Sequence, residues 1–142
     1  MSLERFFKND LVAERSKLLN PLCIDIMTDM YLFCVEHNLP FIVTETVTTA
    51  EEDAALKRVS KSHFERRAFD ISVDKWQKEN GDLFIEHFNF KYEDVAAISL
   101  NSGKPCLVVD ERKPRVDASG KTVRFAHLHV QIHKRFAFKA DA

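Results

Sequence analysis

The stretch RFAHLHVQIH, residues 124–133, alternates apolar and polar side chains over most of its length. In an extended strand successive side chains point to opposite faces, so this stretch predicts a strand with two dissimilar faces. One face is apolar and is expected to cover the core, with Ala126, Leu128, Val130 and Ile132. The other face carries Phe125, His127, His129, Gln131 and His133. The histidines and the glutamine of this face suit metal binding. Taken by itself, however, the stretch is explained equally well by a half-exposed strand that happens to carry histidines.

The sequence before this strand predicts helices first and further strands later. Asn20 and Pro21 are typical of a helix N-cap and of the first helical residue. Apolar residues recur at helical spacing from there to about Glu36. The stretches FIVTETV (41–47) and RAFDISV (67–73) are rich in β-branched residues and predict strands.

The remaining elements complete an α+β pattern. Thr49 and Glu52 form a capping-box pattern for a short helix to about Lys57, and Asp74 is expected to cap a helical region that continues through residues 82–94. The last part of the chain predicts a hairpin of 95–100 with 105–111 and a second turn at 117–121 into a final strand 122–133. Because helices come first and a largely antiparallel sheet comes last, we predict the α+β class, with residues 1–142 as a single domain.

Composition excludes several classes of partner. The chain carries a net charge of −1, with 45% hydrophobic and 30% charged residues, which is ordinary for a globular protein. Such a balance gives no broad attraction to nucleic acid or to anionic lipid, so neither a nucleic-acid nor a membrane partner is expected. The N-terminal residues 1–17 are charged and lack a long apolar run, which predicts no secretory signal and synthesis in the cytoplasm.

The three cysteines, Cys23, Cys34 and Cys106, lie in apolar contexts without CxxC spacing. Their odd number and spacing predict buried free thiols rather than disulfides or a cysteine-built zinc site.

A second stretch, SKSHFERRAFDIS (60–72), changes the interpretation of the histidine-bearing strand. Zinc is bound by imidazole nitrogen and carboxylate oxygen, and a catalytic zinc has three protein ligands with one position open. His63 from a loop and Asp70 from the following strand supply one ligand of each kind, and His129 completes the set. A histidine seven residues before an aspartate is a weak pattern by itself, but it gains specificity beside a later His-x-His.

The segments SHFERRAFD and HLHVQ together resemble the zinc peptidases of the LAS group, which is named for lysostaphin-type enzymes, D-Ala-D-Ala peptidases and the sonic hedgehog signalling domain. The nearest resemblance is to the D-alanyl-D-alanine carboxypeptidase branch, which includes small phage and bacterial cell-wall peptidases. The family pattern is a serine, then His-x-x-Gly-x-Ala-x-Asp, and later His-x-His or Glu-x-x-His. His63, Ala68 and Asp70 match the first element, and His127 and His129 match the second.

This resemblance implies a hedgehog/D-Ala-D-Ala-peptidase-like fold in which His63, Asp70 and His129 bind one Zn²⁺. His127 would then lie beside the metal as the catalytic hydrogen-bonding or proton-transferring group. The implied activity is zinc-dependent hydrolysis of short peptides, most directly the peptidoglycan stem peptide, by a carboxypeptidase or endolysin-like enzyme. Because no export signal is predicted, release to the cell wall would need another route, such as a phage holin-type pore.

The chain departs from the family pattern at several positions. Arg66 stands in place of the glycine, and because arginine adopts positive φ less readily than glycine, the loop is expected to have a different shape. Lys61 replaces the serine, Thr48 falls where an arginine anchors the substrate carboxylate, and Ala126 falls where relatives place a general-base glutamate.

Three polar residues are the candidates for substrate binding: Arg58, Arg67 and Gln131. Guanidinium groups match carboxylates bidentately, so either arginine could replace the missing anchor, although such arginines also form structural ion pairs. His37 and His87 are expected to be structural, and His133 lies about 13 Å beyond His129 along an extended strand, too far for the same ion.

Two alternatives to the peptidase stay open at this point. One is a catalytically impaired zinc-binding module of the same fold that acts in binding or structure, and the other is a structural fold without metal. The oligomeric state and the bond that would be cleaved are not determined by the sequence.

Overall fold

The computed structural model describes residues 6–57, 61–124 and 126–138. Its helices and strands are α1 (Asp10–Ser16), α2 (Pro21–Glu36), β1 (Val43–Glu45), α3 (Ala50–Ala55), β2 (Ala68–Ser72), α4 (Lys78–Lys91), β3 (Val108–Glu111), β4 (Arg115–Val116), β5 (Thr122–Arg124) and β6 (His127–Gln131). Two short 3₁₀ helices, η2 (Glu93–Val95) and η3 (Lys134–Phe136), complete the set. Helices combine with an antiparallel sheet, which confirms the predicted α+β class.

The main sheet has four strands in the order β1-β2-β6-β3, and all neighbouring pairs are antiparallel. β6 is therefore a central strand, between β2 and β3. In the register of β2 with β6, Asp70 lies opposite His129 and Ser72 lies opposite His127. The two sequence segments that were expected to form a metal site are thus brought together by strand pairing.

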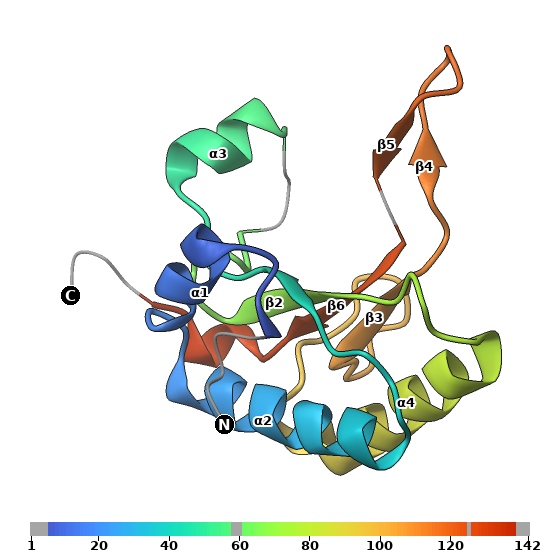
Figure 1. Ribbon diagram of the computed structural model, residues 1–142. Coiled ribbons are helices and arrows are strands. Elements are labelled where there is room, and N and C mark those ends of the chain that lie inside the picture. The colour runs from blue at the N-terminus through green and yellow to red at the C-terminus, as the bar shows by residue number, and fades with distance from the viewer. Residues whose placement is uncertain (1–5, 58–60, 125, 139–142) are drawn as a thin grey trace.

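The apolar face of the sheet is covered by α2 and α4, which lie together on one side in Figure 1. Phe69 and Ile71 of β2 and Leu128 and Val130 of β6 are completely buried, as the alternation in the sequence predicts. The helices contribute the other part of this core, with Cys23, Ile26, Met27, Met30, Phe33, Cys34, Phe84 and Phe88. Burial of these aromatic and aliphatic side chains is the main stabilising contribution to the fold.

The opposite face of the sheet is bordered by α3 and by the β4–β5 hairpin, which stand on the other side from α2 and α4 (Figure 1). β4 and β5 form a separate two-stranded sheet, with a turn in which Gly120 has a φ of +86°. The prediction of one continuous strand over 122–133 is therefore wrong, because β5 pairs locally across this turn and only β6 joins the main sheet. Phe125 lies outside the described residues.

The helix caps predicted at Asn20 and at Thr49 are present, and the one predicted at Asp74 is not. The Asn20 side chain accepts a hydrogen bond from the Leu22 N–H at 2.9 Å, and Thr49 and Glu52 form both bonds of a capping box. The expected cap at Asp74 is wrong, because α4 begins at Lys78 after Gln77 and has no side-chain cap.

The predicted hairpin of 95–100 with 105–111 is only partly formed. The expected first strand is reduced to isolated bridges of Ala96 with Ile132 and of Ile98 with Pro105, and Val95 belongs to the end of η2. The second half contains β3 as expected.

The cysteines are free thiols, as predicted. Burial raises the pKa of Cys23 and of Cys34 to about 12, so neither is a reactive thiolate at neutral pH. Cys106 is only partly buried, which differs from the prediction. Among the described residues, no helix has the length and apolar character needed to cross a membrane.

The loop that leads into β2 keeps a left-handed residue at the position of the family glycine. Arg66 has a φ of +60°, and its N–H donates to the His63 carbonyl at 3.0 Å. Its guanidinium lies 3.6 Å from the centre of the Phe138 ring. The backbone turn at this position thus has the positive φ that glycine favours, and the strain is offset by a cation–π contact.

This arrangement predicts how the stability responds to substitution of Arg66. Arg66→Gly should change the free energy of unfolding by less than about 1 kcal/mol, because relief of backbone strain and loss of the cation–π contact nearly cancel. Arg66→Val should be less stable than Arg66→Gly by about 2 kcal/mol, since a β-branched residue is strained at positive φ. Urea unfolding of both variants measures the difference, and equal stability would contradict the assigned turn geometry.

Candidate metal centre

The polar face of the sheet gathers the candidate ligands in one row across three strands. Asp70 lies opposite His129 on one side and opposite Glu45 on the other. Regular alternation would put Glu45 on the same face as the completely buried Val43, but an irregularity in the register between these two residues turns Glu45 to the polar face. A bulge in β1 therefore adds a carboxylate to the row.

His63 reaches this row from the loop before β2. Its side chain is buried, and its Nδ1–H donates a hydrogen bond to the Thr46 carbonyl at 2.6 Å. This bond leaves Nε2 as the lone-pair nitrogen of a neutral ring, and Nε2 lies 3.3 Å from Asp70 Oδ1. Metal-binding histidines commonly donate their second nitrogen to a carbonyl in this way.

His129 is oriented by polar groups on its far side. Its Nε2 lies 2.7 Å from Gln131 Oε1 and 3.3 Å from Ser62 Oγ. With the Nε2–H donated to the Gln131 oxygen, Nδ1 faces Asp70 Oδ1 at 2.7 Å. It donates a hydrogen bond to this oxygen when the ring is protonated and offers a lone pair to a cation when the ring is neutral.

The consequence is a convergence of three electron-pair donors. His63, Asp70 and His129 each offer one ligand atom, and these atoms all lie within 4.8 Å of one another. Because the second nitrogen of each imidazole has a carbonyl oxygen as its partner, the atoms that face each other are all acceptors. Such an arrangement is stable only with a positive charge among them, supplied either by protons on the rings or by a metal ion. The residues therefore fit a metal centre.

The electrostatics of the group agree with this need for a cation. Burial acts to raise the pKa of Asp70, but the charges and hydrogen bonds of His63 and His129 hold it well below its ordinary value. Burial acts to lower the pKa of His63, yet Asp70, together with Glu45 and the Thr46 carbonyl, raises it above its ordinary value. Asp70 is thus a buried anion at neutral pH, and it favours a positive neighbour.

His127 lies beside this group and is paired with a carboxylate that the sequence did not indicate. Its Nε2 lies 2.7 Å from Glu111 Oε2 and 3.9 Å from Asp70 Oδ2. Glu111 comes from β3, directly opposite His127 in the register with β6. The prediction of a strand over 105–111 contained this residue, but only the register reveals that it meets His127.

The three candidates for substrate binding have different positions. Arg67 does not reach the site: its guanidinium donates to Glu65 at 2.9 Å and to the Ile132 carbonyl at 3.1 Å, and its place in the alternation of β2 is opposite to that of Asp70. These contacts favour the structural ion pair that the sequence left open for Arg67, and its contact with substrate stays a prediction. Gln131 is at the site, where it orients His129. Arg58 lies outside the described residues.

The other histidines lie apart from the group, as expected. His133 Nδ1 accepts a hydrogen bond from the Arg135 N–H at the start of η3. His37 and His87 both pack against the Phe33 ring.

Comparison of the chain with models of protein families, with curated proteins and with solved structures gives no match. The conclusions about function consequently depend on the geometry of the site and on the motif resemblance.

Proposed function

We propose that this protein is a zinc-dependent peptidase that hydrolyses short peptides. The observation that carries the proposal is the convergence of His63 Nε2, Asp70 Oδ1 and His129 Nδ1, with the remaining imidazole nitrogens fixed by carbonyl oxygens. Zinc takes nitrogen and oxygen ligands at about 2.0–2.2 Å in a tetrahedron, which places ligand atoms roughly 3.3–3.6 Å apart. The distance of 3.3 Å between His63 Nε2 and Asp70 Oδ1 fits this spacing. The 2.7 Å between His129 Nδ1 and Asp70 Oδ1 would widen slightly.

In this function His63, Asp70 and His129 hold the zinc ion, and Thr46 and Gln131 orient the two imidazoles. When bound, zinc supplies a Lewis acid that polarises a peptide carbonyl and lowers the pKa of water. The loop that carries His63 is closed by hydrogen bonds from Arg66 and Arg67 to the carbonyls of His63 and Ser62. This local closure limits the motion of His63, which favours a preorganised ligand.

Proton transfer is assigned to the His127–Glu111 pair. Glu111 is partly exposed and its Oε2 accepts from His127 Nε2 at 2.7 Å, while the same nitrogen lies 3.9 Å from Asp70 Oδ2, so the pair could hold and pass on a proton beside the ligand group. The pair compensates for Ala126, which replaces the glutamate that many relatives of the resembled family place there. The carboxylate comes from a neighbouring strand instead of from the same one.

The motif resemblance supports a finer statement of fold and substrate. The order of helices and strands and the position of the ligands on antiparallel strands agree with a hedgehog/D-Ala-D-Ala-peptidase-like fold. The substrate we propose is the stem peptide of peptidoglycan, with the enzyme reaching the cell wall after release from the cell.

A zinc-binding module without catalysis is the second candidate. It is favoured by Thr48 and Ala126, because both replace groups that act on the substrate in the resembled family and neither replaces a metal ligand. The two functions predict the same metal content and differ in turnover.

The first prediction of this proposal concerns metal content. The protein should bind one equivalent of zinc, and His63→Ala and His129→Ala should each lose most of it, because two protein ligands hold the ion far more weakly than three. Zinc at about 100 times its dissociation constant should also stabilise the wild type by roughly 2.7 kcal/mol. Elemental analysis after reconstitution and thermal unfolding with and without chelator measure both effects.

His133→Ala is the matched control, since His133 belongs to the same part of the chain but lies apart from the ligand group. Binding below about a tenth of an equivalent in the reconstituted wild type, or full binding by His129→Ala, would rule out the zinc centre.

The second prediction concerns turnover. His127→Ala and Glu111→Gln should retain zinc and lose about 100- to 10,000-fold in kcat on a cleaved peptide, since each removes part of the proton-transferring pair. Digestion of cell-wall peptides with and without chelator, alongside zinc content, gives the measurement.

Asp110→Asn serves as the control, because Asp110 is the neighbouring carboxylate on β3 and pairs with Arg112 instead. Loss of zinc in His127→Ala would make His127 a ligand. If the zinc-loaded wild type cuts no peptide at all, the binding module is the better description.

A further inference from the structure

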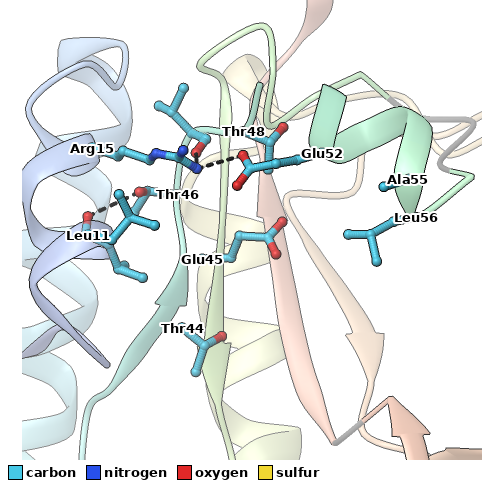
Figure 2. Close-up of a pocket in the computed structure, with 11 residues that line it drawn as sticks. Leu11, Arg15, Thr44, Glu45, Thr46, Thr48, Glu52, Ala55 and Leu56 are labelled. Atoms are coloured by element: carbon cyan, nitrogen blue, oxygen red, sulfur yellow. Dashed lines mark hydrogen bonds and ion pairs between the residues drawn. The ribbon is translucent and has the colours of Figure 1, made fainter. Parts of the chain in front are cut away.

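A pocket of about 290 Å³ lies beside the candidate metal centre, between α1, β1 with the segment that follows it, and α3 (Figure 2). Its walls are formed by Leu11, Val12, Arg15, Thr44, Glu45, Thr46, Val47, Thr48, Glu52, Ala55 and Leu56. We call it the α1–α3 pocket. None of its residues is a proposed zinc ligand, so it needs an explanation of its own.

Glu45 connects the pocket to the metal centre. It lines the pocket, and its Oε1 lies 3.5 Å from Nε2 of His63. The bulge in β1 directs this carboxylate to the polar face of the sheet. A peptide bond placed at the ligand group would therefore bring a neighbouring residue of the same peptide to the mouth of the pocket.

Thr48 provides a polar group without a hydrogen-bond partner among the described residues. The residue is only 6% exposed, and within residues 6–57, 61–124 and 126–138 its Oγ1 is enclosed without a hydrogen-bond partner. By contrast, the hydroxyl of Thr46 donates to the Val12 carbonyl and that of Thr49 caps α3. Because no bond holds the Thr48 hydroxyl, rotation about χ1 can turn it to a ligand without loss of a hydrogen bond, and a buried hydroxyl gains from such a partner.

The charges at the other side of the pocket are already matched. Arg15 donates to Glu52 Oε1 at 2.6 Å and to the Val47 carbonyl at 3.2 Å, as Figure 2 shows. The bond from Arg15 lowers the pKa of Glu52, which keeps it a carboxylate and keeps the pair neutral as a whole. This pair therefore selects neither an acidic nor a basic group.

Apart from Thr44 and Thr46, the remaining wall residues are apolar: Leu11, Val12, Val47, Ala55 and Leu56. An apolar cavity of about 150 Å³ is enough to take up benzene. The pocket of about 290 Å³ therefore has room for one leucine, methionine or phenylalanine side chain together with part of the main chain beside it.

We propose that the α1–α3 pocket binds an uncharged apolar side chain of the substrate peptide, next to the cleaved bond, while Thr48 Oγ1 hydrogen-bonds the main chain of that peptide. This inference rests on the proposed peptidase function and changes the substrate proposed there: a stem peptide presents alanine and charged side chains beside its bonds, whereas this pocket fits a peptide with a larger apolar side chain. It assigns the selection of substrate to shape and apolar contact and not to an ion pair.

The test compares peptides that carry alanine, leucine, phenylalanine, glutamate or lysine at each of the two positions flanking the cleaved bond, with the zinc-loaded protein. At one of these positions leucine or phenylalanine should exceed alanine at least tenfold in kcat/KM, because each methylene in an apolar pocket is worth roughly 10-fold or more. Ala55→Phe should fill the pocket and abolish this preference, so that the leucine, phenylalanine and alanine peptides are cleaved with similar kcat/KM. Thr48→Val should lower kcat/KM about tenfold for all peptides, as expected for one lost hydrogen bond.

Ala54→Phe is the matched control, since Ala54 and Ala55 are adjacent exposed residues of α3 and only Ala55 lines the pocket. Preference for glutamate or lysine at both positions, or equal cleavage of alanine and leucine peptides, would overturn the inference and leave the peptidase function intact.

Binding gives a readout that does not depend on hydrolysis. N-acetyl-leucine methylamide added to the zinc-loaded protein should shift the amide NMR signals of residues 44–48 in the wild type and in Ala54→Phe, but not in Ala55→Phe. If these shifts occur but no peptide is cut, the proposed binding by the α1–α3 pocket is confirmed and the proposed peptidase function is contradicted. If neither cleavage nor shifts occur, both fail.

Discussion

The polar side chains on one face of the sheet are arranged around a single carboxylate oxygen, Asp70 Oδ1. It lies 3.3 Å from Nε2 of His63 and 2.7 Å from Nδ1 of His129, and so joins a loop to two strands. A buried carboxylate is costly unless positive charge accompanies it. Whatever cation completes the group therefore holds the loop before β2 against the centre of the sheet, and the hydrogen bonds from His63 to Thr46 and from His129 to Gln131 determine which ring atoms face it.

The part of the site that depends on local periodicity could be predicted from the sequence. Period-two alternation placed His127 and His129 on the polar face of β6, opposite to the buried Leu128 and Val130. The same rule, extended one residue before β2, places Arg67 on the opposite face from Asp70, where its guanidinium donates to the Ile132 carbonyl.

Glu45 and Glu111 could not be found in this way, because both depend on long-range pairing. Glu45 reaches the site through a bulge in β1, and a bulge reverses every later position in an alternation without a clear signal in the sequence. Glu111 meets His127 through the register of β3 with β6, which a local pattern does not specify. The loop at Arg66 is a related case, since its positive φ is accompanied by a contact with Phe138 near the other end of the chain.

These long-range contacts change how the departures from the family pattern are interpreted. Ala126 removes a carboxylate from β6, but Glu111 brings one to His127 from β3, at 2.7 Å. Thr48 removes a cation from the substrate side, and in its place stands a pocket whose nearby cation, Arg15, is neutralised by Glu52. In the proposed function, the change at Ala126 keeps a carboxylate beside His127 but takes it from another strand. The change at Thr48 replaces a cation that would bind the substrate carboxylate with a pocket that has no free cation of its own in Arg15. A module that only bound zinc would need neither a carboxylate beside His127 nor a pocket whose wall includes Glu45, the carboxylate 3.5 Å from His63 Nε2. Both features lie near the same three residues, and on this ground we propose an active peptidase rather than a module that only binds the metal.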